Sequence, residues 1–375
     1  MKFRVPLKLF ADTLAPAARL SASGSPIPIL ANVKLQAKAG RVTLTGCDLD
    51  REAESACDAD VDTEGETTLN GAKLAEIARA LPKDAMLAFD ISETAAKVTS
   101  GRARFSLPSL PAIDFPHLSE RAPFETSVEL GASDLKAALA ATITAASSEE
   151  TRYYLRGVYF HFRQDSAEGP GVTFIATDGH RFGRRDLALD VAPAAPSLIV
   201  PALTVKELMR LADTAPSGRA RIDLSPVALR IALGAVSLTS KVVEGTYPDY
   251  ERVTPQGLPG RARFDREAAI AALRRVALAT TKERQDVLFD FDEERLLLTA
   301  RNGEGGEACD EVACELEGPP GRVALKLPYA IDALESIGGD TTQFEFGGPR
   351  DFVKLVNYQR PTAGLAVICP LTWRD

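Results

Sequence analysis

The stretch VTFIATDGH (residues 172–180) decides how the chain is organised, because similar stretches stand before and after it. VTLTGCDLD (42–50) precedes it and RLLLTARNGE (295–304) follows it, and each is an apolar run that leads into a polar turn. A helical pattern comes after every one of them: AKLAEIARAL, VKELMRLAD and PYAIDALESIG. This shared order of elements indicates an internal repeat.

The intervals between the three turns fit a three-fold repeat. If Asp48, Asp178 and Asn302 are equivalent, Asp178 stands 130 residues after Asp48, and Asn302 stands 124 residues after Asp178. One third of the 375 residues is 125. The sequence therefore predicts three similar domains, and glycine and proline gather at the expected junctions. The domains are predicted at 1–121, 122–254 and 255–375.

Each domain is predicted to hold two helices on antiparallel sheet, an α+β fold. Leu135, Leu139 and Ile143 show the apolar spacing of an amphipathic helix. Ser133 and Asp265 are the residue types that cap helix starts. The expected helices are 7–20, 72–81, 132–147, 205–213, 265–280 and 328–338. The expected strands include 86–91, 95–100, 103–107, 157–162, 220–224, 229–233, 236–240 and 287–291.

Composition limits the classes of protein that fit. Apolar residues make up 45% and charged residues 26%, as in globular domains, and no apolar run reaches the length of about 18 residues that a membrane helix needs. The first 20 residues resemble a targeting segment only in their early basic residues, so we expect a folded strand and helix there. The net charge of −8 leaves two readings: nucleic acid is not the partner, or basic residues gather on one face.

The cysteines predict neither disulfides nor a metal site. Five of them are scattered along the chain, which is typical of a reducing cytoplasm. Cys309 and Cys314 stand close together, but no second Cys/His pair completes the four ligands of a structural zinc. We therefore expect a cytoplasmic protein without metal or cofactor.

Six segments in order resemble the bacterial DNA sliding-clamp family, the beta subunit of DNA polymerase III, from end to end. They are the opening MKFRV with 26–50, SGRARFSLPSLPAIDFPHL (100–118), TRYYLRGVYF (151–160), ATDGHRFGRR (176–185), GTYPDYERVTP (245–255) and AVICPLTW (366–373). The resemblance implies two protomers joined head to tail into a ring of six similar domains. Alanine-rich helices would line the hole through which duplex DNA passes, held by sequence-independent phosphate contacts.

The resemblance also explains an acidic protein that holds DNA, since basic residues on the helices would face the hole while acidic stretches such as 58–66 lie outside. The alternative for each basic residue is an ordinary solvated helix face. Where the family has basic residues, this chain has Gly24-Ser25 and Ala202-Leu203, so we expect low, steeply salt-dependent DNA affinity. The DNA-facing residues would be Lys8, Arg19, Lys73, Arg79, Lys136, Lys206, Arg210, Arg274 and Arg275.

In the family, partner proteins dock a short peptide between the second and third domains, and matching residues are present here. For His180, an incidental place in a turn capped by Asp178 is the alternative. The chain departs from the family at Cys369, Leu371 and Trp373, which puts the shape of the pocket in doubt. The deeper apolar part would be Leu155, Thr177, Gly179, His180, Arg181, Phe182, Pro248, Val253, Val367 and Cys369. The adjoining part would be Arg152, Tyr154, Arg252, Tyr329, Pro370 and Leu371.

The resemblance places the seam between protomers at the first and third domains. Phe105 and Leu107 on an exposed edge strand would face Leu278 and Ala279, with Lys282 and Arg284 nearby. The alternative is that Phe105 belongs to the core of its own domain.

Two other functions are weighed against the clamp. An enzyme is disfavoured, because the chain has no phosphate-loop, HExxH or GxSxG motif and only three separated histidines. A clamp paralogue specialised for repair, plasmid replication or antibiotic tolerance stays open because of the departures at Gly24, Ala202 and Cys369. For the clamp itself, the expected partners are duplex DNA, a second copy, the replicative polymerase, the clamp loader and other DNA-processing proteins that carry a clamp-binding peptide.

Overall fold

The structure is a computed structural model that describes residues 1–21, 26–118, 123–164, 169–190, 194–302 and 305–373. It divides into two compact units, which are described separately. Unit 1 contains Met1–Ser133 and Arg210–Val242, and unit 2 contains Asp134–Met209 and Val243–Asp375. The predicted boundary at residue 121 and the departure at Gly24-Ser25 lie outside the described residues.

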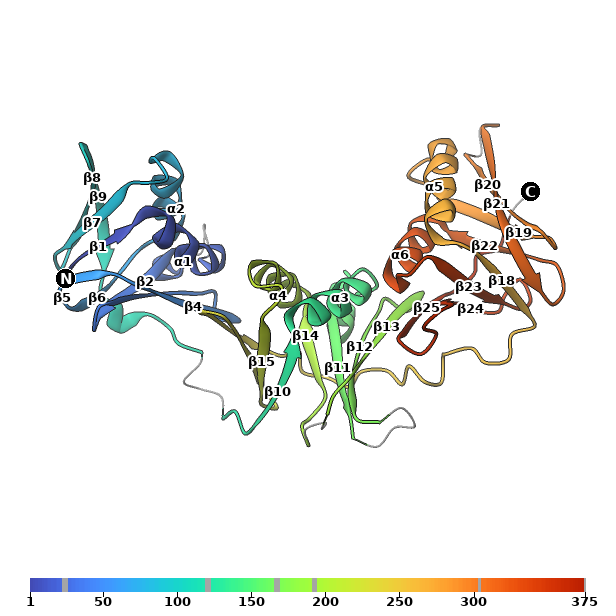
Figure 1. The fold of residues 1–375 in the computed structure, drawn as a ribbon, viewed down its shortest axis with the longest axis horizontal. Helices are drawn as coiled ribbons and strands as arrows, with labels where there is room; N and C mark the ends of the chain where they lie inside the picture. Colours follow the sequence, from blue (N-terminus) through green and yellow to red (C-terminus); the bar gives the residue numbers. More distant parts are fainter. Residues whose placement is uncertain (22–25, 119–122, 165–168, 191–193, 303–304, 374–375) are drawn as a thin grey trace. The chain divides into compact units, whose positions relative to one another are not determined.

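Unit 1 is built on one antiparallel sheet, in the order β10-β15-β16-β17-β4-β3-β2-β6-β9-β8-β7-β1-β5. Helices α1 (Leu7–Leu20) and α2 (Gly71–Ala80) pack against each other, and α1 covers β3 and β4 (Figure 1). The strands are β1 Lys2–Pro6, β2 Asn32–Lys38, β3 Arg41–Cys47, β4 Arg51–Asp58, β5 Asp60–Thr63, β6 Gly65–Asn70, β7 Met86–Ile91, β8 Ala95–Ser100, β9 Ala103–Leu110, β10 Thr126–Gly131, β15 Arg219–Leu224, β16 Ala228–Leu233 and β17 Val236–Lys241.

Unit 2 repeats this plan, with the order β14-β11-β12-β13-β25-β24-β23-β18-β21-β20-β19-β22. Helix α5 (Arg266–Val276) packs on β20 and β21, and α6 (Leu327–Ile337) on β24 and β25 (Figure 1). The strands are β11 Gly157–Arg163, β12 Gly171–Thr177, β13 Arg181–Ala188, β14 Leu198–Pro201, β18 Gly260–Asp265, β19 Asp286–Phe291, β20 Arg295–Arg301, β21 Glu307–Glu317, β22 Gly321–Lys326, β23 Thr341–Phe346, β24 Val353–Asn357 and β25 Gly364–Ile368. Helices α3 (Ala132–Ile143) and α4 (Ala202–Thr214) lie mostly within unit 2, and each has a few residues assigned to unit 1.

Helix α1 covers its sheet because it has one apolar face and small residues at the contact. In α1, Phe10, Leu14 and Ala17 are buried in the core of unit 1. Gly46 on β3 lies so close to the Ala17 carbonyl that a Cβ would stand 2.0 Å from its oxygen. The alanine and the glycine together therefore set how closely α1 lies on the sheet.

The repeat is visible in the hydrogen bonds of the turns that revealed it. Asp48 accepts hydrogen bonds from the amides of Asp50 and Arg51, and Asp178 accepts them from the amides of His180 and Arg181. In both turns the arginine side chain returns to the same carboxylate. Asn302 caps its loop through the amide of Gly306. The expectation that Asp48 and Asp178 cap turns is confirmed.

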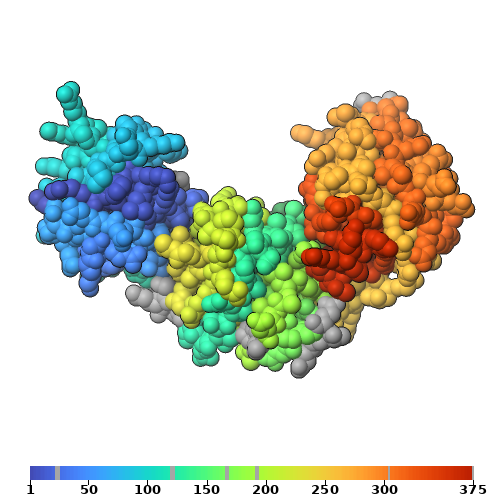
Figure 2. All heavy atoms as spheres, in the orientation of Figure 1, coloured from blue at the N-terminus to red at the C-terminus, as the bar shows by residue number. Residues whose placement is uncertain are grey.

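In each unit, the strand that follows the aspartate turn pairs with a strand of the neighbouring predicted domain. In unit 1, β4 pairs antiparallel with β17, from Arg51 opposite Ser240 to Ser55 opposite Val236. In unit 2, β13 pairs antiparallel with β25, from Arg181 opposite Ile368 to Arg185 opposite Gly364. Figure 2 shows the yellow part of the chain against the blue part, and the red part against the green. Each sheet is therefore continuous across two of the predicted domains.

Most predicted elements are present, and the errors lie at helix ends. Helix α3 ends at Ile143, not at residue 147, and begins at Ala132, so Ser133 is not its cap. Helix α5 ends at Val276 and continues as a short 3-10 turn, Ala277–Ala279. Asp265 caps α5 as expected, accepting a hydrogen bond from the Ala268 amide at 2.7 Å. No helix among the described residues is long and apolar enough to cross a membrane.

Candidate partner groove

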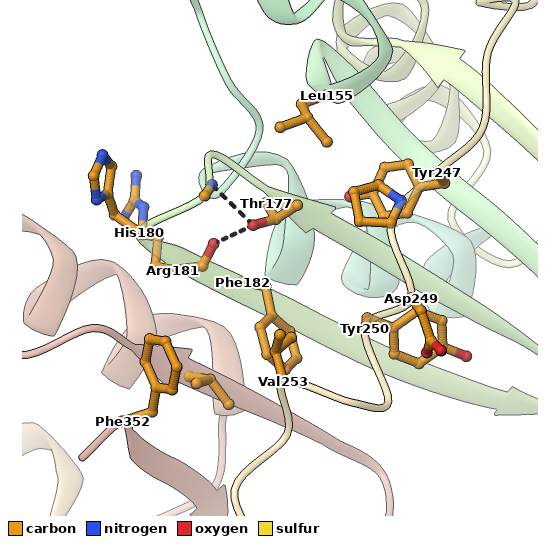
Figure 3. Close-up of a pocket in the computed structure, with 13 residues that line it drawn as sticks. Leu155, Thr177, His180, Arg181, Phe182, Tyr247, Asp249, Tyr250, Val253 and Phe352 are labelled. Carbon is orange, nitrogen blue, oxygen red and sulfur yellow. Dashed lines mark hydrogen bonds between the residues drawn. The ribbon is translucent and has the colours of Figure 1, made fainter.

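A cavity of about 170 Å³ lies in unit 2, beside the join of β13 and β25 (Figure 3). Its walls come from the β12–β13 turn, from the connection that follows β17, and from the loop before β24. The lining is mostly apolar, so the cavity suits an apolar side chain better than a charged group. It is lined by Leu155, Thr177, Gly179, His180, Arg181, Phe182, Tyr247, Pro248, Asp249, Tyr250, Val253, Phe352 and Val367.

The turn at one wall is held rigid by its own hydrogen bonds. The Thr177 hydroxyl donates to the Arg181 carbonyl at 2.7 Å and accepts from the Gly179 amide at 3.1 Å, as Figure 3 shows. Gly179 has a φ of +90°, which glycine adopts without strain. With the Asp178 cap, these bonds fix the exposed His180 at the rim. The capped-turn alternative for His180 is therefore correct as geometry, and His180 also lines the cavity.

The wall opposite is a connection pinned to the sheet by two tyrosines. The buried Tyr247 ring stacks on Tyr159, with ring centroids 4.6 Å apart. The Tyr250 hydroxyl lies 2.8 Å from Nδ1 of His161. Burial raises the pKa of Tyr247 well above its ordinary value and raises the pKa of Tyr250 to about 12. Both phenols are therefore neutral at physiological pH and act as structural anchors.

Arg181 joins the β13 end of the groove to helix α6. Its guanidinium donates to Asp178 at 3.2 Å, to Asp332 at 2.6 Å and to the Thr144 carbonyl at 2.5 Å. It also lies over the Tyr329 ring, 4.0 Å from the centroid. With its side chain only 12% exposed, Arg181 holds the wall in place more than it offers donors to a ligand.

The rim of the cavity carries apolar side chains that are open to solvent. Val253 is 46% exposed and Phe352 is 41% exposed, and both point toward the cavity in Figure 3. Four lining residues were not expected from the sequence: Phe352, Tyr247, Asp249 and Tyr250. The three in the connection stand within GTYPDYERVTP, where their closeness to the predicted Pro248, Arg252 and Val253 was a usable signal. Phe352 had none, because its loop has no repeat pattern.

Several residues predicted for the groove lie around the cavity without lining it. Cys369 donates its amide to the His180 carbonyl at 2.8 Å, and the Leu371 amide donates to the Ala324 carbonyl at 2.7 Å. Pro370 stands between them. Tyr329 lines a neighbouring small hollow together with Arg181, Phe182 and Val367. Three predicted residues remain. Arg152 donates to the Asp178 carbonyl, and Arg252 pairs with Asp249. Tyr154 packs against the buried cluster that contains Tyr247 and Tyr250.

Models of the DNA polymerase III beta subunit match the chain in three consecutive stretches. The N-terminal domain matches residues 1–119, the central domain 129–249 and the C-terminal domain 251–370. The chain belongs to the DNA polymerase III beta subunit family. It is accordingly a DNA sliding clamp, a processivity factor without catalytic activity.

Relatives of known name agree with this membership over most of their length. The beta sliding clamp of Caulobacter vibrioides (strain NA1000) is 34% identical over 326 residues, 86% of this chain and 87% of the relative. That of Escherichia coli (strain K12) is 32% identical over 343 residues, 90% of each. A crystal structure of a sliding clamp from Bartonella birtlesii, bound to griselimycin, has 31% identity and a TM-score of 0.94 and covers 100% of both chains. These relatives favour a general clamp over a specialised paralogue.

The basic residues expected to face DNA in this clamp are on helices, and several have acidic neighbours. Lys8 pairs with Asp12 at 3.0 Å and Lys73 with Glu76 at 2.6 Å. Arg274 pairs with Glu335, and Arg275 pairs with Asp310. The others are Arg19, Arg79, Lys206 and Arg210, which are exposed, and Lys136, which is half-buried. These pairs lower the net positive charge of the helices.

The predicted seam residues differ in how open they are. Leu278 is 87% exposed on the 3-10 turn after α5, and Lys282 is also exposed. Leu107 is only 8% exposed and belongs to the core of unit 1, against which Phe105 packs half-buried. The alternative that Phe105 belongs to its own core is therefore partly correct. Ala279 and Arg284 are half-buried.

Proposed function

We propose that this clamp closes as a head-to-tail homodimer around duplex DNA in the cytoplasm, and that the groove at the β13–β25 join tethers its partner proteins. The partners would be the replicative polymerase, the clamp loader and other DNA-processing proteins, each through a short peptide. Membership of the family implies DNA, a polymerase and a second copy as partners. The main observation in favour of ring closure is a pair of strand edges, on β9 and β21, that have a partner strand on one side only among the described residues.

The repeat supports ring closure because each join uses equivalent strands. Strand β4 of unit 1 and strand β13 of unit 2 follow the Asp48 and Asp178 turns, and they pair with β17 and β25. The third strand of that kind is β21, which follows the Asn302 loop. Among the described residues, its segment 307–313 pairs only with β20, and segment 103–107 of β9 pairs only with β8. Pairing of these edges between two copies would extend both sheets and leave neither edge open.

Leu278→Asp tests the seam. A charge on this exposed leucine would face an apolar neighbour in the closed ring, so we expect dissociation to monomers at micromolar concentration. Sedimentation velocity measures the result. Ile113→Asp is the matched control, because Ile113 is 86% exposed and lies outside the proposed seam. A Leu278→Asp protein that sediments as the wild-type dimer would contradict the seam.

The groove would take the apolar anchor of a partner peptide, a leucine or a phenylalanine. The apolar cavity supplies the anchor site, while exposed His180 and the backbone groups of the rim offer hydrogen bonds. The tail residues Cys369 and Leu371 would continue the groove beyond the cavity.

Peptide titration tests the groove and its tail. We expect Cys369→Asp and Leu371→Ala to weaken binding of a labelled peptide with glutamine, leucine and phenylalanine anchors by about tenfold, the loss of one apolar contact. Fluorescence anisotropy measures the affinity. Val227→Ala, which changes a 55% exposed valine of unit 1, is the control. Wild-type affinity in both tail variants would remove these residues from the groove.

The family has basic residues at the position of Ala202-Leu203. In this chain, neighbouring basic residues would contact DNA in their place. A hollow of about 500 Å³ lies at the start of α4, and its lining includes Leu203, Arg156 and Lys206. Arg156 and Lys206 are both exposed there. With these two exposed cations in place of the family's basic residues, we expect weak duplex binding by the unloaded ring, falling steeply with salt.

A further inference from the structure

The segment 369–373, here called the tail strap, is attached to unit 2 at three successive points. The Cys369 amide donates to the His180 carbonyl at the groove rim. Leu371 forms an antiparallel bridge with Ala324 on β22, the outermost strand of the unit 2 sheet. The Trp373 ring lies near two guanidinium groups, with Arg301 5.7 Å and Arg284 5.9 Å from its ring centroid. The strap therefore runs from the groove along the sheet edge to a cationic clasp.

The clasp can hold the strap because both arginines are themselves fixed. Arg301 pairs with Glu307 at 2.9 Å, and Arg284 lies 3.8 Å from Asp286. A guanidinium near an indole face is attracted by the negative face of the ring, and tryptophan is the best aromatic partner for it. Trp373 is half-buried, so the ring also gains contact area against the sheet end. One side chain thus anchors a segment that otherwise has two backbone hydrogen bonds.

We propose that Trp373 is a positioning residue for the partner groove, which it shapes by holding the tail strap against β22. Neither Trp373 nor its neighbours Arg284 and Arg301 line the cavity. It acts through Leu371, which is held at Ala324, and through Cys369, which is held at His180, because both positions depend on the strap staying docked. If the strap is loose, Pro370 and Leu371 become mobile. Binding of a partner peptide must then order them, which costs free energy and lowers the affinity. This inference rests on the proposed groove.

The intrinsic fluorescence of the protein reports on the clasp directly, because Trp373 is the single tryptophan of the sequence. We expect its emission in the free dimer to be partly protected from acrylamide. In Arg301→Met the protection falls, since the ring loses one of its two neighbouring guanidinium groups. Arg301 is chosen over Arg284 because Arg284 is also assigned to the seam. Quenching equal to that of free tryptophan in the wild-type protein would overturn the clasp.

Peptide affinity then tests the role in positioning. We expect Trp373→Ala to weaken peptide binding about three- to fivefold, Arg301→Met to weaken it about twofold, and Trp373→Phe to restore most of the loss, as expected for one cation–π contact. Sedimentation should show an intact dimer for all three. Tyr358→Ala is the control, because Tyr358 is a 43% exposed aromatic residue that lies over another arginine, Arg263.

The outcomes separate this inference from the groove itself. If the wild-type protein binds no peptide, the proposed groove fails, whatever the quenching shows. If the wild-type protein binds peptide and Trp373→Ala binds it equally well, the positioning role is refuted while the groove stands. Loss of affinity in Trp373→Ala with rescue by Trp373→Phe and reduced quenching protection in Arg301→Met supports the proposal.

Discussion

The two sheet joins of the clamp use equivalent strands and end in different environments. At the β4–β17 join the neighbouring space is filled with polar groups. Glu52 is 2% exposed and accepts the Leu118 amide at 2.8 Å, and His117 lies 3.4 Å from the same carboxylate. At the β13–β25 join, Phe182 and Val367 face an open apolar cavity. One join is closed by its connecting segment and the other is left open.

The difference lies in how each connecting segment meets the sheet. The segment after β9 carries Phe115, which is 4% exposed, and His117, so it packs down and satisfies the buried Glu52. The segment after β17 is pinned to the sheet at Tyr247 and Tyr250, and the cavity lies beside these two side chains. The repeat therefore supplies the join, and the side chains of the connection decide whether a partner site forms there.

The arginines of the two turns offer the largest test of this comparison. Among the described residues, Arg51 pairs with Asp48, whereas Arg181 binds two carboxylates and a carbonyl and covers Tyr329. We expect Arg181→Ala to lower the free energy of unfolding by about 3 kcal/mol and Arg51→Ala by about 1 kcal/mol, because the first leaves more partners unsatisfied.

Urea unfolding measures both arginine variants. Circular dichroism follows the whole chain, and the emission of Trp373, which lies in unit 2, follows that unit alone. The Arg181→Ala effect should therefore appear in both signals and the Arg51→Ala effect mainly in circular dichroism. Equal losses for the two variants would mean that the open join is no more dependent on its arginine than the closed one.

A smaller effect is expected at the closed join. Glu52→Gln keeps an acceptor for the Leu118 amide but removes the charge beside His117, so we expect a loss of about 1 to 2 kcal/mol, as for a hydrogen bond to a charged group. Glu54→Gln, on an exposed position of the same strand, is the control and should change stability by less than about 0.5 kcal/mol. A similar loss in both variants would show that the buried carboxylate does not close this join.

The sequence predicted the parts of the molecule that depend on local pattern. Period and turn chemistry indicated the α+β class, the repeat and the caps at Asp48 and Asp178, because such residues act on their own neighbours. The ends of α3 and α5 were misplaced, since alanine continues a helical pattern past the point where packing stops it.

Long-range geometry was less accessible to the sequence. The resemblance supplied most of the cavity lining, yet Phe352 and the commitment of Arg181 to Asp332 depend on where distant elements meet. Nothing in the order of residues marks Arg181 as an anchor for α6 and not as a donor at the rim. Leu107 was expected at an open edge and is buried, because alternation along a strand shows that two faces differ and not which one meets the core.

The smallest expected effect concerns the pH dependence of the open join, where His161 holds Tyr250. Burial lowers the pKa of His161 below its ordinary value of 6.5, helped by Arg163 and Arg184 and opposed by Glu251 and Asp186. The unfolded chain then binds a proton more readily than the folded one, so stability falls as the pH drops through 6.5 and levels off below the folded pKa. Thermal unfolding of unit 2, followed by Trp373 emission between pH 8 and pH 5, measures this slope, which should be weaker in His161→Gln and unchanged in His180→Gln. If His161→Gln keeps the wild-type slope, protonation of His161 is not the cause of the pH dependence of stability at the β13–β25 join.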